Sequence, residues 1–333
     1  MKRIQFSTAL ILSSIMSMSV SFADSDRPLF SVSVSESGVP QSNSEGGITR
    51  SSTTESRVLP IWGDEARARG YDLPEPFGVS YGYMNMRQDI VVDRIGFIAP
   101  ENPDFSNAIH IEAGHTRQKS ETHTLKLDSW VFPFLNVYGL YGHTKGKSHT
   151  TLKGGSFALA PGFVIPLDPF LKGQPFDLDF KGKTYGAGFT LAGGYNDFFT
   201  TLDLNYTKTD LDILDGDIKA LIISPRVGYT FTFDPLIDGQ GNTKVQVWTG
   251  AMYQDITQRF KGDINKLNLP GKFQDIVNSI DEPGMKFDVK QHLAHKWNNT
   301  VGARVEFTRN FNVLTEFGFN NRNTFFVSGE FRF

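Results

Sequence analysis

The carboxyl terminus alternates between two kinds of side chain. One phase holds Phe325, Val327, Gly329, Phe331 and Phe333, and the other holds Phe326, Ser328, Glu330 and Arg332. Successive side chains of a β-strand point to opposite faces. This period of two therefore predicts a strand that is apolar on one face and mostly polar on the other.

The same alternation recurs in twelve segments, most of them near the roughly 9–11 residues that a tilted strand needs to cross a bilayer. In the clearest, 185–193, the large apolar residues are all odd-numbered and every even position is small. The segments are 77–85, 89–97, 108–117, 123–131, 134–144, 183–195, 198–208, 218–233, 244–254, 298–308, 311–320 and 324–333. We expect an all-β fold, an antiparallel up-and-down transmembrane β-barrel of about twelve strands over residues 77–333.

Aromatic residues gather at the ends of these segments, whereas a soluble β-sandwich would hold them mid-strand in its core. One girdle would consist of Phe132, Phe134, Tyr195, Phe198, Phe231, Phe233, Phe307, Phe311, Phe331 and Phe333. The other would consist of Tyr83, Tyr141, Tyr185, Tyr206, Tyr253, Phe317 and Phe325. Aromatic rings suit the interface between hydrocarbon and headgroups.

The lengths of the connections predict an orientation. The joints at Pro133, 196–197, 234–243 and Asn310 are mostly short, as periplasmic turns are. The two longest connections, 145–182 and 255–297, then lie outside the cell, where barrels carry long loops.

The amino terminus reads as a secretory signal peptide over residues 1–23. Lys2 and Arg3 precede a run of apolar and small residues, and Ser21-Phe22-Ala23 is a small-x-small cleavage site. The alternative is an inner-membrane anchor, but the apolar run is shorter than the roughly 20 residues that a spanning helix needs. Residues 24–76 predict a flexible periplasmic leader with a short helix at 64–69. That helix either caps the periplasmic mouth or lies on the surface.

Composition excludes several classes of function. The 333 residues carry a formal charge of −3, and this mild acidity argues against a nucleic-acid partner. Because the chain has no cysteine, thiol chemistry and cysteine metal sites are excluded. We expect a monomer.

The combination of signal peptide, alternating strands, aromatic girdles and terminal phenylalanine resembles Gram-negative outer-membrane β-barrel proteins. Trp130–Gly139 (WVFPFLNVYG) and Trp297–Arg304 (WNNTVGAR) are similar to strings in a family of such barrels without assigned function. The resemblance implies the cell outer membrane, insertion by the barrel-assembly machinery through Phe333, and no active residues.

The polar phase supplies the candidate lumen-lining residues. They are Glu112, Lys126, Asp128, Asp203, Asn205, Arg226, Gln246, Arg304, Glu306, Glu316, Glu330 and Arg332. In one interpretation the arginines line a path for small anions or polar solutes. In the other, which we favour, acids and bases pair across strands, because buried charges must be paired or wet. The expected function is a narrow passive channel or transporter for small polar solutes. The alternatives are a non-conducting structural or surface-binding barrel and, third, a barrel enzyme.

A basic cluster lies in the lipid-facing phase at the expected outer rim. It consists of His115, Arg117, Lys119, His123, His143, Lys145 and Lys147. Lysine and arginine bind phosphates, and the outer leaflet carries those of lipopolysaccharide. The cluster predicts lipopolysaccharide binding at His115, Arg117, Lys119, His143, Lys145 and Lys147. The alternative is that these are solvated loop charges.

Catalytic and metal sites are weakly indicated, and we expect neither an enzyme nor a cofactor. Of the histidines only His110 lies in a clear lumen phase, and no serine-centred motif accompanies it. Residues 210–217 depart by one residue from calcium-loop spacing. His292 and His295 have no evident third ligand.

Overall fold

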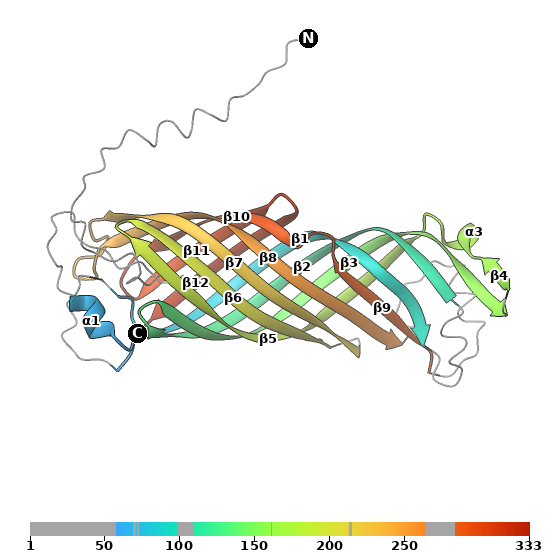
Figure 1. Cartoon of the computed structure of the whole chain (residues 1–333), viewed down its shortest axis with the longest axis horizontal. Helices are drawn as coiled ribbons and strands as arrows, with labels where there is room; N and C mark the ends of the chain where they lie inside the picture. The colour runs from blue at the N-terminus through green and yellow to red at the C-terminus, as the bar shows by residue number, and fades with distance from the viewer. Residues whose placement is uncertain are drawn as a thin grey trace, which may run out of the picture.

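The alternating segments close into one antiparallel sheet, drawn in Figure 1. This computed structural model describes residues 58–68, 71, 73–98, 109–160, 162–212, 215–263 and 284–333. The expected signal peptide and the leader as far as residue 57 lie outside the described residues. The expectation of an all-β, antiparallel barrel is confirmed.

In the described ranges two short helices accompany the sheet, α1 (Gly63–Ala68) and α3 (Asp168–Leu171). The strands are β1 (Phe77–Ile98), β2 (Ile109–Phe132), β3 (Leu135–Ala160), β4 (Phe163–Pro166), β5 (Pro175–Tyr195), β6 (Phe198–Leu211), β7 (Asp215–Phe233), β8 (Thr243–Asp263), β9 (Lys286–Leu293), β10 (Trp297–Glu306), β11 (Phe311–Phe319) and β12 (Arg322–Arg332). No described helix is long and apolar enough to cross a membrane.

In the half of the barrel that carries the carboxyl terminus, every strand has two hydrogen-bonded neighbours. The ring runs β1–β2–β3–β5–β6–β7–β8–β10–β11–β12 and returns to β1. It closes where Arg332 lies opposite Gly78 and Arg322 lies opposite Gln88. A closed ring leaves no unpaired strand edge to lipid, which is the condition for spanning a membrane with strands.

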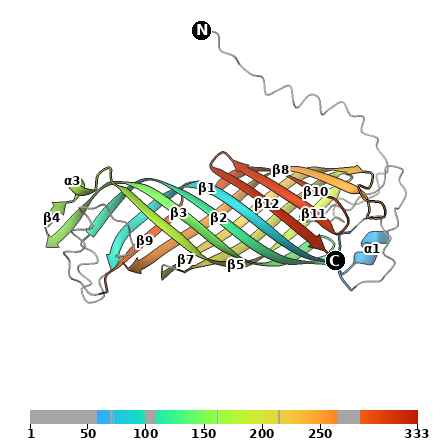
Figure 2. The same ribbon diagram turned by 180° about the vertical axis from the view of Figure 1, so that it is seen from behind.

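The other half is built differently, because β11 and β12 form a short hairpin that ends partway along the barrel (Figure 2). Beyond its tip, β9 takes the hairpin's place. β1 pairs with β9 from Ile90 onward, and β8 pairs with β9 from Thr257 onward. The long strands β1, β2, β3, β5 and β8 therefore project beyond the hairpin together with β9, and we call this part the extension.

At two places where we expected two strands joined by a turn, the structure has one continuous strand. Segments 77–85 and 89–97 form the single strand β1, and 108–117 and 123–131 form the single strand β2. The residues between them, 86–88 and 118–122, contain no glycine, proline or asparagine that would favour a turn. The sheet still has twelve strands, because β4 and β9 were not expected.

The long loop expected at 145–182 is also largely strand. β3 continues to Ala160, where it pairs with β4, and β5 starts at Pro175. Likewise β8 continues to Asp263, and β9 lies inside the second expected loop, 255–297. Polar residues occupy both phases in much of these stretches, so the alternation that reveals a lipid-facing strand is absent.

The four joints expected at the periplasmic face all lie at the end that carries Phe333, which we call the turn end (Figure 1). The amide of Phe333 donates to the carbonyl of Phe77 over 2.9 Å. The helix expected at 64–69 is α1, one residue earlier. Beside it, Trp62 packs on Phe132 and Phe134, with ring centroids 5.0 and 6.4 Å apart.

Aromatic rings cover the outer wall at two levels. At the turn end the girdle includes the ring contacts Phe77–Phe333, Phe331–Phe333, Phe307–Phe311 and Phe198–Tyr229. At the second level Tyr141, Tyr185, Tyr206, Phe317 and Phe325 are exposed. Exposed aliphatic residues such as Leu127, Val137 and Leu191 lie between the levels. Such a surface is suited to lipid.

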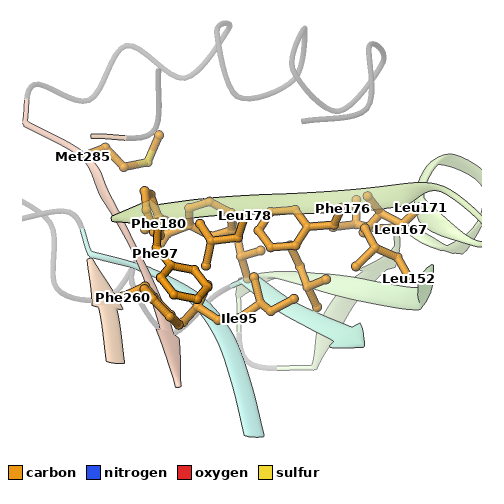
Figure 3. Close-up of a cluster of buried hydrophobic side chains, with 14 residues drawn as sticks. Ile95, Phe97, Leu152, Leu167, Leu171, Phe176, Leu178, Phe180, Phe260 and Met285 are labelled. Carbon is orange, nitrogen blue, oxygen red and sulfur yellow. The ribbon is translucent and has the colours of Figure 1, made fainter. Parts of the chain in front are cut away.

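The extension holds an apolar core, shown in Figure 3. It consists of Ile95, Phe97, Ile109, Ile111, Leu152, Leu167, Leu171, Phe176, Leu178, Phe180, Phe260, Met285, Phe287 and Val289. A register shift between Val92 and Arg94 changes the phase of β1, so that Ile95 and Phe97 point inward. The extension is a packed body in its own right.

Candidate functional site: the barrel lumen

Ion pairs fill the lumen at the turn end, and we call this layer the floor. Arg332 Nη1 lies 2.9 Å from Asp128 Oδ2 and 2.6 Å from Glu330 Oε1, and Arg332 is only 1% exposed. Asp128 also accepts a bond from Asn136 Nδ2 over 2.7 Å. Gly78 makes room for this cluster, since a Cβ there would collide with Asp128 and Arg332. Pairing of this kind offsets the cost of burying the charges.

A second ion pair joins two strands that are not neighbours in the ring. Arg226 on β7 donates from Nε and Nη2 to the carboxylate of Glu316 on β11, over 2.7 and 3.1 Å. Trp248 Nε1 on β8 donates to the same carboxylate over 2.7 Å. Such two-point contacts between arginine and carboxylate are strong and fix the geometry of both side chains.

The chain before β1 closes the floor from below. Glu75 is buried and accepts a bond from Arg309 Nε over 3.0 Å, and its backbone oxygen accepts one from Arg332 Nε over 2.9 Å. On the neighbouring wall, Arg304 Nη1 lies 3.3 Å from Gln246 Oε1. Glu306 lies 3.9 Å from Arg304 and 4.0 Å from Lys244.

An aromatic cluster fills the rest of the lumen at this level. It consists of Trp130, Ala192, Phe199, Trp248 and Leu314, with Phe326 packed against it. These side chains are inward-facing and buried, and they pack beside the ion pairs.

Above the floor lies a cavity of about 250 Å³. One wall is a ladder of threonine hydroxyls: Thr122, Thr144, Thr184 and Thr209 on four adjacent strands bond in sequence over 3.0, 2.7 and 2.8 Å. Apolar side chains also line it, among them Met84, Met86, Met252, Ile222 and Ile256, together with further polar residues such as Ser224, Gln254 and Thr324. Asp203 lies at the boundary with the floor and accepts bonds from Tyr138, Thr190 and Asn205.

Glutamines cross the lumen above the cavity. Gln88 and Gln258 both donate to Gln118 Oε1, over 3.0 and 3.2 Å, and Gln291 donates to Gln258. These side chains come from β1, β8, β2 and β9. The apolar core of the extension lies directly above the glutamines, and in it the ring centroids of Phe180 and Phe260 are 5.5 Å apart. We call the glutamines and this core together the roof.

The predicted rim residues lie on the outer wall, not in the lumen. Arg87, Lys119 and Lys147 are directly opposite one another on β1, β2 and β3. Lys145 pairs with Glu121 over 2.9 Å, and this carboxylate raises the pKa of the lysine. Lys147 pairs with Asp177 over 3.2 Å, which raises its pKa likewise.

The histidines of the rim have separate neighbours. His123 bonds Tyr81 over 2.8 Å and lies opposite His143. His115 and Arg117 lie 3.4 and 3.3 Å from Asp89.

Most of the predicted lumen residues face inward. They are Lys126, Asp128, Asp203, Asn205, Arg226, Gln246, Arg304, Glu306, Glu316, Glu330 and Arg332. The prediction for Glu112 is wrong, because its side chain is exposed on the outside, as is that of His110. Two register shifts, at Glu112/Ala113 and Ala113/Thr116, separate these residues from the phase of the rest of β2.

Several lumen residues were not predicted. The glutamines and Trp248 carry no charge and were passed over, although Gln88 and Gln118 lie in the inward phase of strands that continue through the expected turns. Glu75 precedes the first strand, so no alternation marks it.

The described residues contain no group of three or more histidine, cysteine, aspartate or glutamate side chains that could hold a metal ion. His292 bonds Asp93 in an ion pair of 2.8 Å. Asp210, in the calcium-like sequence, pairs with Lys208 over 2.7 Å, and residues 213–214 lie outside the described residues.

No protein-family model matches the chain, and no curated protein matches it. Among solved structures it is similar to the transport unit of the autotransporter AIDA-I from Escherichia coli, with 9% identity, 78% of this chain and 90% of that chain covered, and a TM-score of 0.36. It is also similar to the β domain of the Bordetella autotransporter Brka, with 10% identity, 78% and 100% covered, and a TM-score of 0.35. It is similar as well to the Ralstonia pickettii toluene transporter TbuX, with 9% identity, 78% of this chain and 90% of that chain covered, and a TM-score of 0.30.

The chain is an outer-membrane β-barrel. This conclusion rests on its own ring of hydrogen bonds and on its apolar outer wall with two levels of aromatic rings.

Proposed function

We propose that this outer-membrane barrel is closed to passive diffusion and serves as a non-conducting anchor for the extension, which lies on the cell surface. The observation that carries the proposal is the double closure of the lumen. Arg332 in the floor is 1% exposed, and Phe260 in the roof is 0% exposed. A channel needs a continuous wet path, and these two layers interrupt it.

The floor resists opening for an energetic reason. Separating Arg226 from Glu316 would break a two-point ion pair, and separating Arg332 from Asp128 would break one of the two carboxylate contacts of a buried guanidinium. Breaking one such buried pair costs about 3–5 kcal/mol. A state in which both have parted would therefore be rare without an external trigger.

A second candidate function is the passage of small polar solutes that the sequence led us to expect. The central cavity supports it, because its threonine wall and its charged floor are suited to polar molecules. In this candidate the floor and the roof open only in response to a signal, and the cavity is an intermediate binding site for the solute.

The outer wall supports a lipid partner for either candidate. We call the depression lined by the bases Arg87, Lys119, Lys145, Lys147 and Lys181 the lysine groove; Glu121 and Asp179 also line it, and it has a volume of about 490 Å³. Like charges directly opposite on neighbouring strands destabilise a sheet, and the bases of the row Arg87–Lys119–Lys147 outnumber the nearby carboxylates, so the groove favours a further anion. The proposed partner is lipopolysaccharide, whose phosphates lie at this level.

Swelling of proteoliposomes tests the closed state. Vesicles that contain the protein should swell in isotonic arabinose or glycine no faster than empty vesicles. Swelling only under a voltage step or in acid would favour the second candidate. Rapid swelling at rest would contradict the proposal of a closed lumen.

A further inference from the structure

The wall of the barrel has a notch where β1 changes partner from β12 to β9. At this point Asn298 braces the tip of the β11–β12 hairpin: its Nδ2 donates to the carbonyl of Arg322 over 2.8 Å, and its Oδ1 accepts from the amides of Arg322 and Asn321 over 3.0 and 3.2 Å. A strongly polar cavity of about 260 Å³ lies at the tip. Its lining comes from residues 87–89 of β1, from Arg117 and from residues 320–323.

Arg322 in this notch is buried without a counter-charge. Its residue is 2% exposed, and neither Nε nor Nη2 has a hydrogen-bond partner among the described residues. A buried cation that lacks an anion is strongly unfavourable. Every other fully buried arginine described above has a carboxylate within 4 Å, so Arg322 stands apart.

The surroundings of Arg322 add positive charge. Arg87 and Arg117 line the same notch, and both are exposed on the outer wall. The carboxylate in the lining is that of Asp89, which is shared between Arg117 and His115. The lining of the notch therefore includes three arginines and one carboxylate.

We propose that the notch binds a phosphate group, and that this phosphate belongs to the lipopolysaccharide of the outer leaflet. The planar fork of arginine matches the oxygens of a phosphate, and a phosphate in the notch would give Arg322 its missing anion. The amide side chains of Asn320, Asn321 and Asn323 are at hand to donate further bonds.

The position of the notch selects the source of the phosphate. The stretch of β1 from Phe77, in the girdle of the turn end, to Arg87 matches the roughly 9–11 residues with which a tilted strand crosses a bilayer. The notch therefore lies at the level of the outer headgroups. Arg87 also lines the lysine groove, so one headgroup with two phosphates would contact both sites. This inference rests on the outer-membrane location, but not on the closed lumen.

The test measures the heat-induced unfolding of detergent-purified barrel, read from the band that migrates fast when unboiled. Inorganic phosphate and, in a separate arm, phosphorylated lipid A are compared with chloride at equal ionic strength. The wild type should unfold at a higher temperature with phosphate or lipid A. Arg322→Met, which keeps the volume of the side chain but removes its charge, should lose this shift. The matched control Lys219→Ser, on the opposite wall, should keep it.

The arms separate the outcomes. A shift with both ligands, or with lipid A alone, that Arg322→Met abolishes supports the proposal. A shift with inorganic phosphate alone would overturn lipopolysaccharide as the source. An equal shift in Arg322→Met and in the wild type, or no shift with either ligand, would overturn the site. If Arg322→Met does not fold, the double variant Arg87→Ser/Arg117→Ser, which changes two exposed residues, replaces it. The concentration of lipid A that gives half of the shift in unfolding temperature should then rise at least tenfold.

Discussion

Arg226 on β7 and Glu316 on β11 form a two-point ion pair although their strands are not neighbours in the ring. The pair therefore acts as a strut on the lumen side of β8 and β10, the two strands between them, and Trp248 on β8 holds its carboxylate from a third strand.

Removal of one end of the strut should destabilise the barrel. Glu316→Ala removes the carboxylate that accepts from Arg226 and from the indole N–H of Trp248, and we expect a loss of about 3–5 kcal/mol in the free energy of unfolding. Urea titration of the barrel in lipid vesicles measures it. The double variant Arg226→Met/Glu316→Met, which removes both charges, should lie much closer to the wild type. An effect of Glu316→Ala below 1 kcal/mol would mean that the strut is not formed.

The apolar core should stabilise the extension independently of the membrane-spanning ring. Phe260 is fully buried against Phe180, and Phe260→Ala should cost about 3–5 kcal/mol. Hydrogen exchange should accelerate in β8, β9 and the start of β5, while the fast-migrating band persists. Phe163→Ala is the matched control, because this phenylalanine is exposed on β4 and should have little effect. Uniform acceleration over the whole barrel would contradict a separate core.

The extension should also loosen in acid. Arg259 donates two hydrogen bonds to Asp288, over 2.9 and 2.8 Å, and these bonds lower the pKa of the aspartate. The stabilisation is complete above the unfolded-state pKa of about 3.9 and is lost as the pH falls through the lower folded-state value. Protection of β8 and β9 should thus persist at about pH 5 and fall below about pH 4. Asp288→Asn should reduce protection at neutral pH and flatten this part of the pH profile; an unchanged profile would exclude the pair as its cause.

Loss of the lysine groove should weaken retention of lipopolysaccharide. Each base near an anionic surface contributes about 1 kcal/mol, so Lys119→Ser/Lys145→Ser/Lys147→Ser should reduce the lipopolysaccharide that copurifies. The control removes three lysines from other strands: Lys208, Lys219 and Lys261. Equal retention of lipopolysaccharide in the two triple variants would mean that the lysines of the groove are ordinary solvated charges that do not bind it. The notch variant Arg322→Met leaves every residue of the groove intact, so it tests the notch separately from the groove.

The period of two was sufficient to find the barrel and most of its inward charges, because the phase is unbroken where strands cross the membrane. Asp203 and Glu316 lie in such stretches. Glu112 was misplaced because β2 changes phase through two register shifts that no residue pattern announces. The strands β1 and β2 were each divided in two because the extension continues them beyond the span of a bilayer.

The buried cation of the notch could not have been predicted from alternation. Arg322 is the first residue of β12, directly after the turn at Asn320 and Asn321, where a charged residue is ordinary. Its burial follows from the tertiary arrangement in which β9 replaces the hairpin beside β1. The same arrangement places the glutamines across the lumen.

The closed lumen is the central claim, and recording across a planar bilayer tests it most directly. The purified wild type, inserted at known protein density, should show no steady conductance in 1 M salt at modest voltage. Insertion is verified in the same preparation by the fast-migrating band. The variant Arg226→Ser/Glu316→Ser/Arg332→Ser, which breaks the two main ion pairs of the floor while the roof remains, should conduct little more. A steady, ohmic conductance from the wild type would contradict the closed lumen.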